Sequence, residues 1–414
     1  MKRAGYKAIS PDNQHMQYKP SRSTIFILTA GCFLAFFIFG FTDNLKGPTL
    51  PAMLAELNIN YGTGGNIFFG EYLGFLIATL ITGLLADRFG LKLVILLAGI
   101  CLLVGVGGYS LFQLPIFLSA SLFVVGLGLG AFELGPNAII VNLHHEHKGL
   151  YLNLMAVLHG LGSMLAPLFA GWLFALNTSW RTIYRWDLIL IAVFILLSVF
   201  LRFPKTEEKV ELDFCHIPQI AFKGQLPWFY VVIGLYVAAE IGIGSWLVTF
   251  LQHMRGATVT SSTQLLSLFF ATLMAGRLLG GFFVHRIGYL RSIFFASVGG
   301  LICILIGLFG PAQLSFFLPM TGLFFSIIFP TITAAVSDLH AENINTILGV
   351  LFTFAGLGGL LGPWLVGWGS DLFGLQTGFI VILVFTALMS ISILILMKGT
   401  DHAAETQLGT SFDR

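Results

Sequence analysis

The ten residues GLLADRFGLK, at positions 83–92, form a short charged segment between two long apolar runs. The run before it covers about 66–86, and the run after it covers about 92–112. A helix needs about 20 mainly apolar residues to cross a lipid bilayer, and each run has that length. The segment therefore predicts a tight loop between two membrane-spanning helices, and the rest of the chain can be read outward from it.

Apolar runs of this length recur along the whole chain of 414 residues, which is 57% hydrophobic and only 10% charged. Soluble domains carry about 25% charged residues, so an ordinary soluble protein is excluded. We predict an all-α membrane protein with twelve transmembrane helices. Pro48 and Pro51 predict a kink or break near the end of the first helix. The predicted spans are about 24–52, 66–86, 92–112, 115–141, 150–176, 186–203, 228–252, 263–285, 291–310, 313–337, 345–370 and 376–397.

The two halves of the chain resemble each other in sequence. The stretch 160–167 aligns with 356–363 at a shift of 196 residues, and 88–90 aligns with 286–288 at a shift of 198. Internal symmetry of this kind is typical of carriers that hold their substrate between two repeats. We therefore predict two pseudo-symmetric six-helix bundles. The predicted parts are a tail 1–22, a bundle 23–203, a linker 204–227, a bundle 228–397 and a tail 398–414.

The charged residues outside the spans predict the orientation. Most of the 21 Lys and Arg residues fall in segments on the side of the N-terminus. Short basic segments stay in the cytoplasm, so both termini are predicted to be cytoplasmic. The 19 acidic residues leave a net charge of only +2, which gives no basic surface for nucleic acid.

Metal and nucleotide chemistry find no support in the sequence. The His144-His145-Glu146-His147 cluster has no further ligand nearby, and no Walker motif is present. The spacing of the four cysteines fits neither a metal site nor a disulfide framework. These are Cys32, Cys101, Cys215 and Cys303.

Two acids inside predicted spans stand at matching places of the repeat. Asp43 and Glu240 are 197 residues apart, and each lies on the first helix of its half. A charge at the bilayer centre costs roughly 2.5–3.5 kcal/mol on insertion scales. We therefore expect a protonatable pair that faces a central cavity. The alternative is two unrelated buried acids held by hydrogen bonds.

Further polar residues inside the spans allow more than one interpretation. Glu133 and Asn137 share a helix face and could hold sugar hydroxyls, pass a proton or join helices. Glu71 and Lys46 could neutralise each other or act in gating. Arg277 is expected to pair with an acid or carbonyl groups of a neighbouring helix.

Ring side chains near the predicted cavity are also candidates. His159 could relay a proton or bind a sugar, or it could be a buried neutral histidine. Tyr236 and Trp246 flank Glu240 on the same predicted helix. Their rings could stack on a sugar, or they could fill space or lie at the membrane interface.

The twelve runs, the central loop and the segment 83–92 resemble the major facilitator superfamily. The resemblance implies its fold and a latch in which Asp87 and Arg88 hold helix ends in the outward-open state. Shorter stretches resemble the branch of fucose/glucose/galactose–proton symporters. These are 39–44, Glu133 with 136–137, 152–154 leading to 160–162, 236–240 with 244–246, and 329–331.

That branch resemblance implies that Asp43 and Glu133 bind the proton and sense the sugar. Two residues depart from the branch pattern. His159 stands where fucose carriers have an amide, and Lys46 lies unexpectedly close to Asp43.

We expect a secondary transporter of the cytoplasmic membrane, and not an enzyme. It would import a hexose or deoxyhexose with a proton by alternating access, as a monomer in the lipid bilayer and without a cofactor. The residues expected to line the substrate site are Asn44, Asn137, His159, Glu240, Tyr236 and Trp246. The alternatives are a sodium-coupled sugar symporter, a proton-driven exporter of drugs or metabolites, a lipid flippase and a non-transporting sugar receptor.

Overall fold

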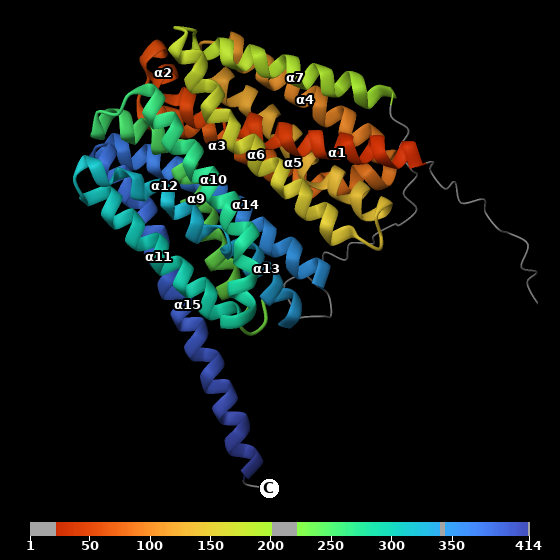
Figure 1. Ribbon diagram of the computed structural model, residues 1–414, viewed down its shortest axis with the longest axis vertical. Coiled ribbons are helices and arrows are strands. Elements are labelled where there is room, and N and C mark those ends of the chain that lie inside the picture. Colours follow the sequence, from red (N-terminus) through yellow and green to blue (C-terminus); the bar gives the residue numbers. More distant parts are fainter. Residues whose placement is uncertain (1–21, 201–221, 340–343, 413–414) are drawn as a thin grey trace, which may run out of the picture.

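The computed structural model describes residues 22–200, 222–339 and 344–412. Residues 1–21 of the predicted tail and 204–221 of the predicted linker, with Cys215, therefore lie outside the described residues. The described chain folds into helices that pack as two halves. Figure 1 shows the first half from red to yellow-green and the second half from green to blue.

Among the described residues, seven helices make the first half, because its first membrane span is broken into two. They are α1 (Arg22–Asp43), α2 (Lys46–Leu57), α3 (Tyr61–Phe89), α4 (Leu91–Leu111), α5 (Pro115–Leu143), α6 (Lys148–Ala175) and α7 (Trp180–Phe200).

The second half begins at Leu226. Its helices are α9 (Leu226–Arg255), α10 (Val259–Ile287), α11 (Tyr289–Phe309), the 3₁₀ turn η2 (Ala312–Phe316), α12 (Phe317–Phe325), α13 (Ile328–Leu339), α14 (Ile344–Phe373) and α15 (Leu375–Phe412).

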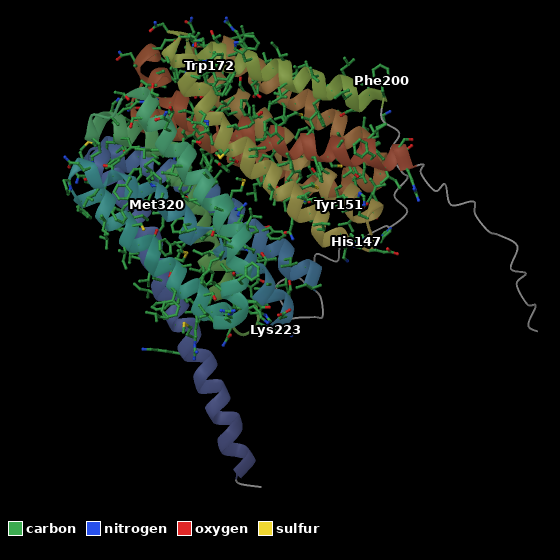
Figure 2. All side chains as sticks on the ribbon, in the orientation of Figure 1. His147, Tyr151, Trp172, Phe200, Lys223 and Met320 are labelled. Atoms are coloured by element: carbon green, nitrogen blue, oxygen red, sulfur yellow. The ribbon has the colours of Figure 1, made fainter. Side chains whose placement is uncertain are left out.

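The predicted count of membrane spans is confirmed. The described residues contain twelve segments that are long and apolar enough to cross a bilayer. Large apolar side chains also project from the outer surface, among them Phe26 and Phe282, which are 74% and 76% exposed. Trp172 and Phe200 are further examples, labelled in Figure 2. An apolar exterior of this extent suits contact with lipid rather than with water.

The broken spans have a proline four residues after each break. The first span is interrupted between Asp43 and Lys46, and Pro48 is the cause we assign, because its ring clashes with the carbonyl of residue 44. The tenth span is interrupted between Phe325 and Ile328, four residues before Pro330. The predicted break in the first span is therefore confirmed, although it lies before the prolines rather than at them.

The sequence repeat reappears as a repeated turn. Only Gly90 separates α3 from α4, and only Gly288 separates α10 from α11. Both glycines have a positive φ, of 84° and 87°, with nearly equal ψ. L-residues with a side chain avoid this region. The turn is shorter than we expected, so Asp87 and Arg88 lie in the last turn of α3 and not in a loop.

We call the side where α1 begins and α7 ends the terminal face, and the side of the α2–α3 turn the opposite face. The halves meet through α3 against α14, α6 against α10 and α2 against α9. A Cβ atom on Gly47 of α2 would lie 2.2 Å from the carbonyl oxygen of Gly244 of α9, so only glycine permits this approach. Figure 1 shows the helices of the two halves spreading apart toward the terminal face.

Candidate functional site

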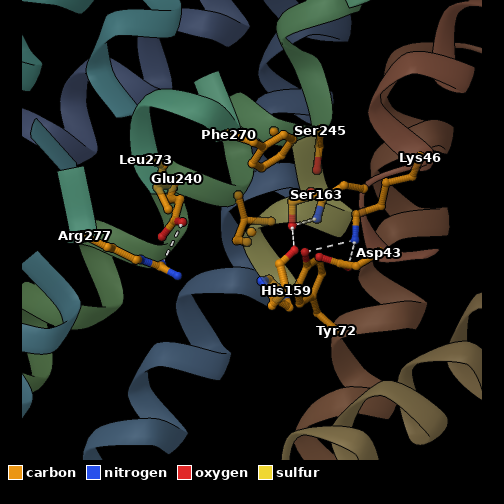
Figure 3. A pocket seen from close by; sticks show the side chains of 14 residues that line it. Asp43, Lys46, Tyr72, His159, Ser163, Glu240, Ser245, Phe270, Leu273 and Arg277 are labelled. Atoms are coloured by element: carbon orange, nitrogen blue, oxygen red, sulfur yellow. Dashed lines mark hydrogen bonds and ion pairs between the residues drawn. The ribbon is translucent and has the colours of Figure 1, made fainter. Parts of the chain in front are cut away.

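A cavity of about 50 Å³ lies where the two halves meet. The first half contributes Asp43, Asn44 and His159, and the second half contributes Glu240 and Arg277. Figure 3 shows Asp43 with Lys46 on one side and Glu240 with Arg277 on the other. At roughly 10–15 Å³ for each water position, the cavity holds a few water molecules. The structure thus brings four of the sequence-predicted site residues to one place.

A buried charge cluster forms the wall contributed by the first half. The Lys46 Nζ donates to Asp43 Oδ1 at 2.5 Å, to Glu71 Oε2 at 2.9 Å and to the Tyr72 hydroxyl at 3.0 Å. The side chain of Lys46 is only 6% exposed. The expected pairing of Lys46 with Glu71 is present, and Asp43 joins it because the helix break brings residues 43 and 46 together.

A looser ion pair forms the wall contributed by the second half. Arg277 Nη2 lies 3.7 Å from Glu240 Oε1, and their side chains are 32% and 15% exposed. Arg277 on α10 thus pairs with an acid of the neighbouring helix α9. Glu240 is the repeat counterpart of Asp43, so each repeat-related acid in the cavity carries a basic partner.

Neutral polar groups in the α1–α2 break and on α6 complete the cavity. The Asn44 side-chain amide donates to the carbonyl of Gly40 at 2.9 Å and to Ser163 Oγ at 3.0 Å. Ser163 in turn donates to the carbonyl of His159 at 2.9 Å. The His159 ring packs edge to face against Phe39 at 4.7 Å. Among the described residues, no hydrogen bond engages the His159 ring nitrogens or Asn44 Oδ1, so these atoms are available to a ligand.

Glu133 and Asn137 do not line the cavity. The Asn137 side-chain amide donates to the backbone carbonyl of Glu133 at 2.6 Å, so it does not hold the carboxylate. In the described part of the chain the Glu133 carboxylate has no ion pair, but it interacts electrostatically with Arg277. Arg277 therefore connects Glu133 on α5 with the cavity.

Tyr236 and Trp246 do not line the cavity either, although the Tyr236 hydroxyl interacts with the cavity residues Glu240 and Arg277. Both are completely buried. The Trp246 indole donates to the carbonyl of Pro363 at 2.9 Å, and its ring contacts Tyr61 and Phe68 edge to face. The Tyr236 ring packs against Phe325. In this conformation neither ring is placed to stack on a ligand in the cavity.

The two faces of the molecule differ in how the halves are joined. On the opposite face, Asp371 of α14 accepts hydrogen bonds from the backbone N–H groups of Tyr61 and Gly62 at 2.9 and 2.8 Å. Asn66 of α3 accepts from the indoles of Trp364 and Trp368. On the terminal face, Asp87 and Arg88 are exposed, and neither forms an ion pair with another described residue. Side-chain contacts thus join the halves on the opposite face, and the role of Asp87 and Arg88 as a latch stays a prediction.

The sequence did not single out every residue that the site uses. Tyr72 and Ser163 are ordinary residues in apolar runs, although Ser163 lies within the repeated stretch 160–167. Asp187 is completely buried on α7 and accepts from the Thr42 hydroxyl at 2.9 Å. Its acidic side chain near the start of the predicted span 186–203 was a signal that could have found it.

The chain is similar to known transport proteins over most of its length. Residues 32–344 match the sequence pattern of the Major Facilitator Superfamily. The chain belongs to this superfamily. The "Glucose/galactose transporter" of Brucella abortus is 25% identical over 393 residues, which cover 89% of this chain and 93% of that protein.

Solved structures of other transporters share the fold. The nucleoside transporter NupG has a TM-score of 0.75 at 14% identity, over 91% of this chain and 99% of that one. A variant of the E. coli fucose:proton symporter FucP has a TM-score of 0.62 at 18% identity, over 90% and 99%. The relatives are transporters, and the similarity extends over both six-helix halves.

Proposed function

We propose that this chain imports a monosaccharide, a hexose or deoxyhexose, together with a proton, with both termini in the cytoplasm. The observation that carries the proposal is the polar cavity between the halves, lined by Asp43, Asn44 and His159 on one side and by Glu240 and Arg277 on the other. Sugar hydroxyls need both donors and acceptors, and this wall offers both. The similarity to a protein named glucose/galactose transporter supports the same substrate class.

The character of the lining argues against an exporter of apolar drugs. Phe270 is the sole phenylalanine among the described residues that line the cavity, although the chain contains 41. Charged and hydroxyl groups of this density suit a hydrated, polar substrate. A lipid flippase would have to move acyl chains past charged side chains such as Asp43, Glu240 and Arg277, although Ile241, Phe270 and Leu273 add apolar surface. The two repeat-related halves are typical of carriers that alternate between two states, which favours transport over a static receptor.

The charges around the cavity favour coupling to a cation. Buried carboxylates require a counter-charge or a proton, and the acids here outnumber the bases. Of the two acids that the family resemblance assigns to the proton, Asp43 is held by Lys46. Glu133 has no such partner among the described residues. We therefore place the transported proton on Glu133. The acids are Asp43, Glu71, Glu133 and Glu240, and the bases are Lys46 and Arg277.

The test is uptake into proteoliposomes of a panel of labelled hexoses, deoxyhexoses, pentoses and nucleosides under an imposed proton or sodium gradient. We expect one monosaccharide to accumulate with the proton gradient. Glu133→Gln should abolish accumulation, yet keep exchange of labelled for unlabelled sugar, because exchange needs no net proton movement. Glu146→Gln makes the same chemical change in an exposed loop of the terminal face and should transport normally.

Each other outcome changes a defined part of the proposal. Accumulation that follows sodium and ignores protons keeps the sugar and replaces the coupling ion. Accumulation of a nucleoside alone keeps the coupling and replaces the substrate. No uptake of any compound in the panel under either gradient contradicts the proposal as a whole.

A further inference from the structure

Lys46 is an unusual side chain for the middle of a membrane protein. Lysines near membranes normally extend toward water, but this one is 95% buried, with 5% of its surface exposed. It lies at the first position of α2, where the positive end of the helix dipole disfavours a cation. Its placement therefore depends on the acids around it.

The ammonium group has three hydrogen-bond partners, one for each of its hydrogens. An ammonium group has three N–H donors and no acceptor. Here the three meet Asp43 Oδ1, Glu71 Oε2 and the Tyr72 hydroxyl, all within 3.0 Å. The ring of Tyr72 also lies 4.5 Å from Nζ, within cation–π range. Two carboxylates and a hydroxyl from α1 and α3 thus surround one positive charge.

The ammonium group lies between two small cavities, a position that a small ion could also occupy. Lys46 borders the central cavity on one side. On its other side it borders a second cavity of about 10 Å³, next to Thr42 and the Tyr184 hydroxyl. A cavity of that size has room for about one water molecule. Carboxylate, hydroxyl and water oxygens are the ligands that alkali and other hard cations prefer.

We propose that Lys46 is a tethered cation that fills a monovalent-cation site formed by Asp43, Glu71 and the Tyr72 hydroxyl. The chain itself supplies the charge that these two carboxylates would otherwise take from solution as a sodium ion or a proton. Removal of Lys46 should turn the same oxygens into a site for an external cation. With Lys46 in the site, the protein would move one cation fewer for each sugar than without it. This consequence rests on the proposed function, whereas the cation site does not.

The test uses Lys46→Gln in the purified full-length protein. The variant leaves two adjacent carboxylates with no basic partner, and one bound sodium ion restores the wild-type charge. At pH 8 its Tm should rise with NaCl, compared with choline chloride at equal ionic strength. A rise of roughly 3 °C is expected at a hundred times the dissociation constant. Wild-type protein should show no such difference.

The matched control is Lys46→Gln combined with Glu71→Gln. This double variant has the wild-type net charge at the site without the lysine, so sodium should not raise its Tm. The Tm of Lys46→Gln without sodium should also fall as the pH rises, because a proton shared by Asp43 and Glu71 is lost. The double variant should show a smaller slope.

Other ionisable groups face this cluster from every side, and all are unchanged in the variants compared. Within the first half these are Tyr109, Tyr184 and Asp187. Across the cavity they are His159, Glu240 and Arg277. A difference between Lys46→Gln and its double variant therefore reports on Asp43 and Glu71.

The results separate the site from the proposed function. Sodium-dependent stabilisation of Lys46→Gln alone supports the site, even where no sugar is transported. Where the sugar is transported, Lys46→Gln should move one cation more for each sugar than wild type. Equal Tm values with sodium and choline overturn the proposal. So does failure of both Lys46→Gln and its double variant to fold, because Lys46 would then hold the structure by more than its charge. Recovery of Lys46→Gln only in sodium or at acid pH supports the proposal.

Discussion

The two walls of the cavity carry related acids in very different surroundings. Asp43 is bound to a lysine that is 6% exposed and that also holds Glu71 at 2.9 Å. Glu240 faces an arginine at 3.7 Å that is 32% exposed. In the first wall Lys46 has no N–H donor left for a ligand, since all three already have partners. The second wall has spare donors, because a guanidinium group has five N–H groups.

The difference separates a fixed charge from an exchangeable one. A loose, partly exposed ion pair can give up its contact to a substrate at little cost. A buried one cannot, because separating it leaves a desolvated charge. We therefore assign recognition of the sugar mainly to Glu240 and Arg277, and assign to Lys46 the neutralisation of the opposite wall.

The largest expected effect is on stability. Lys46→Met should lower the free energy of unfolding by about 3–5 kcal/mol, the usual effect of removing one partner of a buried ion pair. Arg277→Met should lower it by about 1 kcal/mol or less. Thermal unfolding of both variants in one detergent and a sodium-free buffer measures the contrast. Equal losses of unfolding free energy in Lys46→Met and Arg277→Met would contradict the contrast between a tight and a loose ion pair.

The next effect is on sugar affinity. Glu240→Gln should weaken sugar binding about 10- to 100-fold, because a hydrogen bond to a charged group contributes about 1.5–3 kcal/mol. Binding of the transported sugar by calorimetry measures it. The matched control is Glu56→Gln, because Glu56 pairs with Arg181 near the opposite face and away from the cavity. An unchanged affinity in Glu240→Gln would place recognition on the first wall instead.

A smaller effect is expected on the separation of the two halves at the opposite face, the motion that would open the cavity to that side. Asp371 accepts from the first two N–H groups of α3 across the two halves, where helix donors lack partners of their own. Asp371→Ala should shift the population toward opening of the opposite face about 3- to 30-fold, as expected for a cap of 0.5–2 kcal/mol. Spin labels at Leu176 and Gln313, in a cysteine-free background, report the distance between the halves.

The control for this motion is Asp338→Ala. Asp338 accepts from the Tyr289 hydroxyl at 2.6 Å within the second half, so its loss should leave the distance distribution between the labels unchanged. An unshifted distribution in Asp371→Ala would mean that the Asn66 contacts keep the opposite face closed without it.

The sequence predicted the fold well because the membrane makes strong demands on it. A span must be long and apolar, and a charge inside it stands out against its neighbours. Asp43, Glu240 and His159 were found in this way, and all three line the cavity. The repeat also aligned Gly90 with Gly288, and in the structure both glycines form the same turn with positive φ.

What the sequence could not supply is the direction in which a helix face points. Tyr236 and Trp246 lie close to Glu240 along the chain, yet both are buried in packing within their half or against α3. Rotation of α9 by part of a turn would exchange these roles, and the apolar pattern around the helix does not fix it. The Asp43–Lys46 contact likewise depends on the exact residue at which α1 ends.

The smallest expected effect is on the pH dependence of thermal stability, which is also the measurement that reports on Asp43 and Glu71 in the first wall. His144 stacks on Tyr151 at 3.6 Å, and its Nε2 lies 2.8 Å from Thr29 Oγ1. Partial burial, with His147 nearby, holds the pKa of His144 below its usual value of 6.5. The unfolded chain therefore binds more protons near that pH, so acidification through this range lowers stability. His144→Gln should remove this loss, which for a partly exposed group is about 0.5 kcal/mol or less.

The acids left without a partner in Lys46→Gln have the opposite effect, because the stability of that variant falls as the pH rises. Thermal unfolding between pH 5.5 and 8 in the His144→Gln background thus isolates the slope of the first wall. If stability still falls on acidification in the His144→Gln variant as it does in wild type, groups other than His144 cause that loss.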